Sequence, residues 1–194
     1  EISPSLIGED ILPLNIQRKM ASVLNGHNYA KAAIDIASFD VLGKSLDQSV
    51  SDLLGGAVID KVPSYYATGV GLPEEIATIA HEKVLEGYPR LQIKVGGRPI
   101  EIDIEAISKV WEKVGRYNIR LAIDANRGWT TRDTIRISNE LSDIPFVLEQ
   151  PCDTVYDLRK IRSQIHHPIF MDENSVNIPT IINAVGTELV DGFG

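Results

Sequence analysis

Short apolar runs that end in a charged residue recur along the second half of the chain. Two of them, residues 120–124 and 145–149, are largely apolar and finish at Asp124 and Glu149. A short apolar run bounded by turn residues is typical of a strand that is buried on both faces, as in a parallel sheet. The pattern therefore predicts two strands, each with an acidic side chain at its carboxyl end.

The same pattern occurs upstream and downstream at a similar spacing. Residues 90–94 end in Lys94 and residues 168–172 end in Asp172, so the four charged residues lie 30, 25 and 23 positions apart. A strand, a helix and two loops need about 30 residues. We therefore expect the four side chains to converge at one rim of a parallel barrel, where such folds carry their chemistry.

The intervals between the strands predict one helix each, which implies a parallel sheet with right-handed crossovers. The predicted fold class is α/β, a partial (β/α)8-type barrel of about five βα units plus the start of strand six. We expect strands at residues 62–68, 90–95, 119–123, 146–148, 169–171 and from 189 onward, and helices at 74–86, 102–114, 131–141, 156–164 and 179–185.

Residues 1–60 predict a separate helical part, and residues 61–194 the part with the barrel. Helices are expected at residues 11–24, 29–42 and 49–54. The middle one is rich in alanine and apolar on most faces, which is typical of a helix buried against other helices. Gly43 suits the position just after its end.

Length, composition and charge limit the possible functions. The chain has 194 residues, a hydrophobic content of 43% and a charged content of 24%, as in ordinary soluble globular proteins. Its net charge of −8 argues against nucleic acid or an anionic membrane as the main partner. A single cysteine, Cys152, excludes an internal disulfide and indicates a reducing compartment such as the cytoplasm. A barrel of eight units usually takes about 250 residues, so we expect a fragment or a segment of a longer polypeptide.

Asp124, Glu149 and Asp172 would bring three carboxylates together, and like charges need a positive partner. Oxygen ligands of this kind suit a hard cation, most simply Mg²⁺. Each acid alone could be a helix cap or a solvated loop residue, but the common period favours a metal site. Glu173 follows Asp172 directly, and adjacent residues of a strand point to opposite faces, so we expect only one of the two as a ligand.

Lys94 lies one strand before Asp124. An ammonium beside a dication is disfavoured, so the pKa of Lys94 should fall toward neutrality, which makes it a candidate general base rather than a surface lysine. Gln92 faces the same side and is expected to be a hydrogen-bonding neighbour. Asn126 could bind the metal or a ligand, or could only shape the turn after the strand.

The remaining reactive side chains are weaker candidates. Tyr65 or Tyr66 is expected to line the pocket, whereas Cys152 and the two tryptophans are expected to be packing residues. The four histidines lie in predicted helices or just before the fifth strand, away from the rim, so none is expected to be a ligand or a base: His27, His81, His166 and His167.

These motifs together resemble a known family. Lys94, Asp124-x-Asn126, Glu149-Gln-Pro151 and Asp172-Glu173, in this order, are similar to the enolase superfamily in its mandelate racemase and muconate lactonizing enzyme branch. The helical start through Leu53-Leu-Gly-Gly56 is similar to the end of that family's capping domain. Longer strings resemble its hydroxyproline-betaine 2-epimerases and cis-3-hydroxyproline dehydratases: Arg90-Leu-Gln-Ile-Lys-Val-Gly-Gly-Arg-Pro and Phe146-Val-Leu-Glu-Gln-Pro-Cys152.

The resemblance implies a reaction and a site. Asp124, Glu149 and Asp172 would ligate Mg²⁺, which would bind the substrate carboxylate and stabilise the enediolate left when the α-proton departs. Lys94 would remove or return that proton on one face, and a lysine on strand six would act on the other, but the sequence departs from the family by stopping where that strand begins. The implied substrate is a small amino acid or betaine, and the implied assembly is a homo-oligomer.

Several functions remain open at this point. Epimerisation of a proline-betaine or hydroxyproline-betaine, dehydration of cis-3-hydroxy-L-proline, and a non-catalytic metal-binding homologue or inactive fragment all agree with the motifs. A Mg²⁺-dependent aldolase or decarboxylase barrel gives no reason for the Asp-Glu-Asp order with Lys94 ahead of it.

Overall fold

The computed structural model describes residues 2–194. The chain divides into two compact units, Glu1–Val62 and Pro63–Gly194, which are described separately below.

Between residues 2 and 62, the regular elements of the first unit are all helices. Its core is small and consists of Ile2, Ile16 and Met20. Proline opens the second helix, where its missing N–H is not needed, and a capping box of Ser49 and Asp52 opens the fourth. The helices are α1 (Ile2–Leu6), α2 (Pro13–Val23), α3 (Asn28–Leu46) and α4 (Val50–Leu53).

Helix α3 differs from the prediction in two ways. It continues past Gly43 to Leu46, and Asp47 takes the left-handed conformation at its end, with φ of 55°. Gly43 is needed for close approach instead, because a Cβ there would lie 2.7 Å from the carbonyl oxygen of Gln48. The expected burial is also wrong, since only Ser38 and Gly43 of this helix are buried. The small core of the unit offers the apolar faces of α3 few partners.

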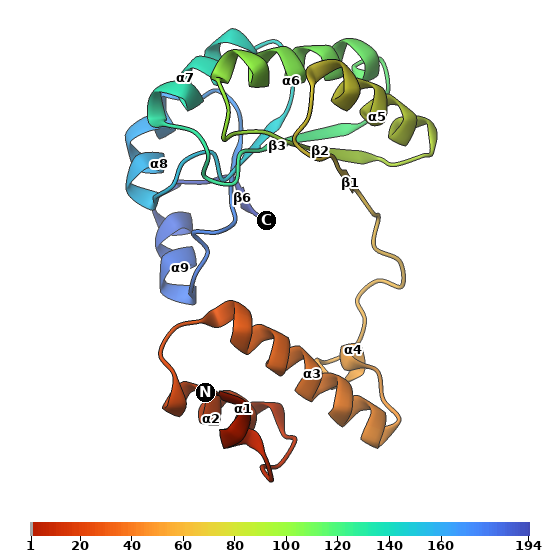
Figure 1. Cartoon of the computed structure of the whole chain (residues 1–194), viewed down its shortest axis with the longest axis vertical. Coiled ribbons are helices and arrows are strands. Elements are labelled where there is room, and N and C mark those ends of the chain that lie inside the picture. The colour runs from red at the N-terminus through yellow and green to blue at the C-terminus, as the bar shows by residue number, and fades with distance from the viewer. Residues whose placement is uncertain (1) are drawn as a thin grey trace. The chain divides into compact units, whose positions relative to one another are not determined.

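The second unit is a six-stranded parallel sheet whose strands follow one another in chain order. Figure 1 shows helices α5 to α9 in an arc along the outer face of these strands. The predicted α/β fold, part of a parallel barrel, is confirmed. The strands are β1 (Tyr66–Ala67), β2 (Arg90–Lys94), β3 (Arg120–Asp124), β4 (Val147–Glu149), β5 (Ile169–Met171) and β6 (Gly192–Phe193); the helices are α5 (Pro73–Leu85), α6 (Ile100–Val114), α7 (Thr131–Glu140), α8 (Val155–Ile161, continued by a 3₁₀ turn over Arg162–Gln164) and α9 (Ile178–Gly186).

Two strands differ from the predicted ranges. The first is limited to β1, because Pro63 near the start of the predicted run lacks the N–H that a ladder requires. The sixth begins at Gly192 rather than at Leu189, which is instead buried in the core. The boundaries of the other four strands agree with the prediction to within one residue.

Side chains along each strand point alternately to an apolar outer face and to a more polar inner face of the sheet. Leu91, Ile93 and Ile123 are completely buried and pack in the main core beneath the helices. Each such side chain removed from water contributes about 1.5–3 kcal/mol to folding. Because successive side chains point to opposite faces, Gln92 and Lys94 lie on the inner face of β2. The core thus fixes which side the predicted rim residues face.

Helix caps hold the loops that follow β3, β4 and β5. The side chains of Thr130, Thr154 and Asn177 each accept a backbone N–H three residues later, at 3.2, 3.1 and 2.9 Å. Such caps stabilise a helix start by about 1 kcal/mol. Each loop at the carboxyl rim is therefore short and ends at a defined residue.

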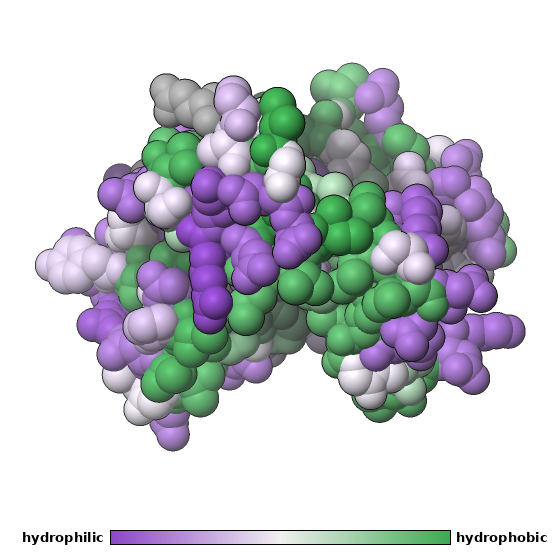
Figure 2. Space-filling view, turned by 90° about the horizontal axis from the view of Figure 1, so that it is seen from below, coloured by the Kyte–Doolittle hydropathy of each residue, from purple (hydrophilic) through white to green (hydrophobic). Residues whose placement is uncertain are grey.

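The surface carries some exposed apolar residues. The face shown in Figure 2 has green, hydrophobic areas between purple, hydrophilic ones. On α9, Ile178, Ile182 and Val185 are more than half exposed and, at helical spacing, form one stripe. Within residues 2–194, none of the helices has both the length and the apolar character needed to cross a bilayer.

Candidate functional site

The strand register brings the predicted site residues to one rim. Lys94 is paired with Asp124, and Asp124 with Glu149, so the three lie side by side at the ends of β2, β3 and β4. Glu149 is paired with Phe170, and Asp172 lies two residues further along on the same face. All four charged residues are therefore found at the carboxyl ends of neighbouring strands.

Asp124 is the centre of the hydrogen bonds at this rim, and its side chain is 1% exposed. Its Oδ2 accepts from Gln92 Nε2 at 2.9 Å and from the Lys94 ammonium. Its Oδ1 accepts from the backbone N–H of Asn126 at 2.9 Å. The expected neighbourhood of Gln92, Lys94 and Asp124 is thus present in the structure.

Asn126 links Lys94 to the loop after β5. Its Oδ1 accepts from Lys94 Nζ at 3.0 Å, and its Nδ2 donates to Glu173 Oε1 at 3.1 Å. The backbone at Asn126 has φ of 44°, a conformation that asparagine tolerates better than most residues. The other oxygen of Glu173 is buried and has no hydrogen-bond partner in the described part of the chain. An unpartnered buried carboxylate oxygen is costly and favours a cationic ligand nearby.

Glu149 and Asp172 are destabilised as carboxylates. Burial, followed by repulsion from Asp124 and Asp172, raises the pKa of Glu149, while Arg90 and Lys94 oppose the rise. Burial, followed by repulsion from Glu173 and Asp124, raises the pKa of Asp172. The nearest guanidinium nitrogen of Arg90 lies 3.5 Å from Glu149 Oε2. The rim thus has more negative charge than its own cations neutralise.

Gly194, which directly follows β6, lies beside both of these acids. A Cβ placed on Gly194 would lie 3.0 Å from Glu149 Oε1 and 3.3 Å from the Cβ of Asp172. The two side chains therefore approach one point on the inner face. A third side chain at that point would compete with them for space.

The donor set fits a hard divalent cation. It consists of carboxylate oxygens that repel one another, which is the composition that Mg²⁺ prefers in proteins. In residues 2–194, however, no group of three or more His, Cys, Asp or Glu side chains is gathered closely enough to hold a metal ion. Instead, the Lys94 ammonium and the Arg90 guanidinium lie against Asp124 and Glu149. The chemistry and the common rim support a metal site, whereas ligation as such stays a prediction.

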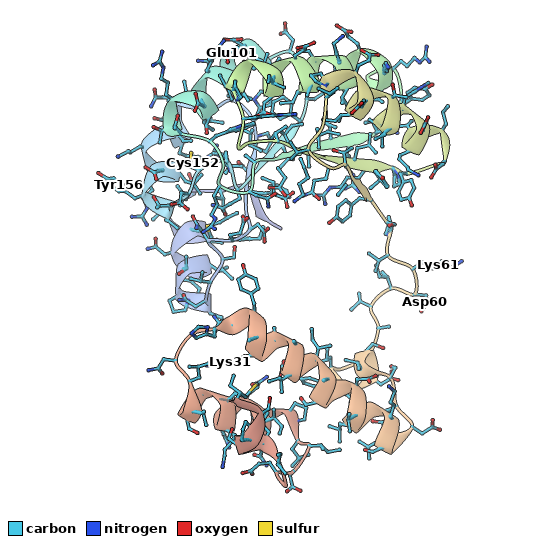
Figure 3. All side chains as sticks on the ribbon, in the orientation of Figure 1. Lys31, Asp60, Lys61, Glu101, Cys152 and Tyr156 are labelled. Carbon is cyan, nitrogen blue, oxygen red and sulfur yellow. The ribbon has the colours of Figure 1, made fainter. Side chains whose placement is uncertain are left out.

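The other predicted residues lie in different surroundings. Tyr65 is about half exposed, with the Arg90 guanidinium 5.0 Å from its ring centre, whereas Tyr66 packs edge-on against Tyr88. Cys152 is buried beside Thr134, and burial raises the pKa of its thiol. Figure 3 shows Cys152 within the fold and Tyr156 projecting outward from α8.

Sequence reasoning missed a buried acid that holds three loops of the rim. Asp103, on α6, is completely buried and accepts from the Gly96 N–H at 2.9 Å, Arg98 Nε at 2.6 Å and Trp129 Nε1 at 2.8 Å. Arg98 also donates to the carbonyl of Gly71. The loops after β1, β2 and β3 therefore share one carboxylate. An acid in the first turn of a helix is ordinarily a solvated charge near the helix dipole, so nothing local distinguished it.

Two more residues near the rim were not predicted. Arg90 faces inward because it alternates with Gln92 and Lys94, and this period of two could have identified it. Gln150 is completely buried and has φ of 35°. Its position in the motif Glu149-Gln-Pro151 was the only signal in the sequence. That position does not predict which residues its side chain contacts.

The fold and the rim together define a class of protein. The chain forms part of a parallel β/α barrel. A lysine and several acids lie at the carboxyl ends of its consecutive strands, which is where barrel enzymes have their active sites. Residues 75–194 match the family described as enolase C-terminal domain-like. Residues 1–55 match the mandelate racemase / muconate lactonizing enzyme N-terminal domain. The chain belongs to this mandelate racemase and muconate lactonizing enzyme family of the enolase superfamily, as its motifs indicated.

Individual relatives support the assignment. The chain is 37% identical over 194 residues to the cis-3-hydroxy-L-proline dehydratase of Roseibium aggregatum, covering 98% of this chain and 52% of that protein. The crystal structure of the N-succinyl Arg/Lys racemase from Bacillus cereus matches with a TM-score of 0.89 and 30% identity, over 99% of this chain and 53% of that one. The dipeptide epimerase from Enterococcus faecalis, complexed with Mg and the dipeptide L-Leu-L-Tyr, matches with a TM-score of 0.83 and 32% identity, over 93% of this chain and 51% of that one. The chain thus spans about half the length of these relatives.

Proposed function

We propose that the protein abstracts the proton α to a carboxylate in a Mg²⁺-dependent reaction. The observation that carries the proposal is the meeting of Lys94 with Asp124 at a rim that also holds Glu149 and Asp172. Asp124, Glu149 and Asp172 would hold the metal, which, when bound, supplies the positive charge that stabilises an enediolate. Since the three carboxylates are desolvated and repel one another, they have the most to gain from such a cation.

Lys94 is the proposed base. Its side chain is 30% exposed, and its ammonium lies against Asp124 at the carboxyl rim. A carboxylate that serves as a metal ligand attracts a neighbouring ammonium less, so metal binding by Asp124 would weaken its ion pair with Lys94. Asn126 Oδ1, 3.0 Å from Lys94 Nζ, would then orient the amine and accept one of its N–H groups. The free electron pair of the nitrogen could take the α-proton of a substrate.

The proposed substrate is a small amino acid derivative. Relatives named as racemase and epimerase support racemisation or epimerisation, which we assign first to a proline-betaine or hydroxyproline-betaine. The 37% identity to a cis-3-hydroxy-L-proline dehydratase favours the second candidate, β-elimination. There the same abstraction by Lys94 breaks the Cα–H bond and moves that proton to the amine. A double bond then forms between Cα and Cβ, and the 3-hydroxyl leaves as water with a proton from the Lys94 ammonium or from solvent.

The two parts of the chain would have different roles. We propose that residues 61–194 are the part of the barrel that carries the metal site and that residues 1–60 are the helical part of a capping domain. The separate family matches at residues 75–194 and 1–55 support this division.

Proton exchange in D₂O tests the proposed reaction. The protein as its gene encodes it would be incubated with Mg²⁺ and each stereoisomer of hydroxyproline-betaine or cis-3-hydroxyproline, and loss of the α-proton signal followed by NMR. Lys94→Ala should slow exchange by about 10²–10⁴-fold on the stereoisomer whose proton it removes. Lys109→Ala, which removes an exposed lysine paired with Glu74, is the control.

The products separate the candidates. An epimer indicates a racemase or epimerase, and loss of the hydroxyl group indicates a dehydratase. Exchange that continues at the wild-type rate in Lys94→Ala would show that another group is the base. A wild-type protein without exchange on any of these substrates would favour a non-catalytic homologue.

A further inference from the structure

Both ends of the Gln150 side chain are fully used. This residue is completely buried between the ends of β4 and β5. Its Oε1 accepts the backbone N–H of Asp172 at 2.9 Å and that of Asn174 at 3.2 Å. Its Nε2 donates to the carbonyl of Cys152 at 3.0 Å and to Asn174 Oδ1 at 3.0 Å. Four hydrogen bonds are the full capacity of a primary amide.

The partners leave one orientation for this amide. Two of them are backbone N–H groups, which require an acceptor, and two are oxygens, of which the carbonyl can only accept. A flipped amide would set its NH₂ against both N–H groups. A carboxylate would satisfy the N–H groups but would repel the carbonyl oxygen. A hydrocarbon would leave all four partners without their hydrogen bond to residue 150.

The backbone of Gln150 also forms hydrogen bonds to β5 and to the loop after β3. Its N–H donates to the carbonyl of Phe170 on β5 at 2.8 Å, and its carbonyl accepts from the N–H of Arg127, beyond β3, at 2.8 Å. Its φ of 35° lies in the left-handed region that non-glycine residues rarely adopt. Such strain persists only where the surroundings over-determine it, and it gathers at functional sites.

Asp172 depends on this residue for its place. Strand β5 ends at Met171, so Asp172 has no partner in the β4–β5 ladder. Its backbone N–H is instead held by the Gln150 side chain, whose own main chain follows Glu149 directly. The buried amide therefore holds the Asp172 main chain beside Glu149, at a position just beyond the last pair of the β4–β5 ladder.

We propose that Gln150 is a positioning residue that fixes Asp172 relative to Glu149 for metal binding. The proposal rests on the proposed function, in which both acids are Mg²⁺ ligands. Gln150 would not touch the metal or the substrate. It would act by limiting the positions that the Asp172 carboxylate can take, as residues that support metal ligands generally do.

Gln150→Met tests this role, because methionine keeps the length of the side chain and removes all four hydrogen bonds. Mg²⁺ affinity would be measured by calorimetry, and Mn²⁺ affinity by electron paramagnetic resonance, on the protein as its gene encodes it. We expect binding weaker by about 10–100-fold, with proton exchange recovering as Mg²⁺ is raised. Because Mg²⁺ would also restore a protein that is only destabilised, thermal unfolding in EDTA must show that the variant is folded without the metal.

Thr134→Val is the matched control. Thr134 is also completely buried, and its hydroxyl bonds the Thr130 carbonyl and the Cys152 thiol, without contact to Asp172 or Asn174 through a hydrogen bond. It should lower the melting temperature without changing Mg²⁺ affinity. Should Gln150→Met fail to fold, Asn174→Ala removes one acceptor of the amide and should weaken Mg²⁺ binding in the same direction by less.

The outcomes are distinct. Wild-type Mg²⁺ affinity in the Gln150 or Asn174 variant, or an equal loss of affinity in Thr134→Val, overturns the positioning role alone. A wild-type protein that binds no Mg²⁺ overturns the proposed function together with it.

Discussion

The two rims of the sheet are built from the same strands, but they differ in the side chains that they bury. The carboxyl rim buries acids and the amino rim mainly apolar groups. At the carboxyl rim, burial and repulsion between neighbouring acids raise the pKa of Glu149 and of Asp172, and Lys94 and Arg90 only partly oppose this. At the amino rim, residues preceding β3, β4 and β5 line an apolar hollow of about 460 Å³. Acidic side chains that repel one another are therefore found at the carboxyl rim, whereas the amino rim is mainly apolar.

His167 shows how the amino rim avoids buried charge. Its ring is stacked on Phe146 at 3.8 Å, and its nitrogens lie 2.9 Å from Ser138 Oγ and 3.0 Å from the Ile144 carbonyl. Burial lowers the pKa of His167, so the neutral ring is favoured, and both of its nitrogens have partners. At the carboxyl rim, by contrast, Glu173 has an oxygen without a partner among the described residues. A candidate site is thus indicated by buried titratable groups whose hydrogen bonds or charges lack partners, and not by titratable groups as such.

The largest effect is expected from Glu149→Gln, which removes charge from the carboxyl rim. The affinity for Mg²⁺ should fall by more than about 10–100-fold, which is the loss typical when a residue that only supports a metal ligand is changed. In EDTA the melting temperature should stay the same or rise, because a carboxylate repelled by Asp124 and Asp172 is gone. Calorimetry and thermal unfolding check the two parts. A lower melting temperature in EDTA would mean that the acids stabilise this rim.

Asp103→Leu should remove the carboxylate that links the rim loops and should lower the free energy of unfolding. Removing one member of a buried ion pair costs about 3–5 kcal/mol, because Arg98, Trp129 and the Gly96 N–H lose their acceptor. Chemical denaturation measures the loss. Glu74→Gln, in an exposed pair with Lys113, should have a much smaller effect, and equal effects of the two would contradict the role given to Asp103.

The smallest effect is expected from His167→Gln, on the pH dependence of stability. The folded pKa of His167 lies below its ordinary value of 6.5, so the unfolded chain takes up the proton first. This residue's contribution is fully present above pH 6.5 and is lost as the pH falls toward the folded pKa. The variant should have a flatter decline in unfolding free energy across that range, measured by denaturation at several pH values. Proton exchange should be unaffected, since His167 lies at the opposite rim.

The linear sequence by itself determined the period of strands and the side on which their residues lie. Apolar runs about 25 residues apart, each ending in a charge, located the ends of β2 to β5, and alternation placed Gln92 and Lys94 with Asp124. Both follow from local geometry, since a strand has a period of two and a βα unit a limited length. The fold and the family were predicted from these patterns and confirmed, whereas the metal ligation and the role of Lys94 stay predictions.

Tertiary structure alone decided which side chains hold the rim together. The amide of Gln150 meets Asp172 and Asn174, 22 and 24 residues away, and Asp103 meets Trp129, 26 residues away. Gly43 likewise proved to be required by a neighbouring carbonyl rather than by a helix end. These contacts depend on strand register and loop path, and a hydrogen bond needs its partners within a few tenths of an ångström. Patterns of hydrophobic and polar residues say which face a side chain takes, but they do not carry distances between segments that are far apart in the chain.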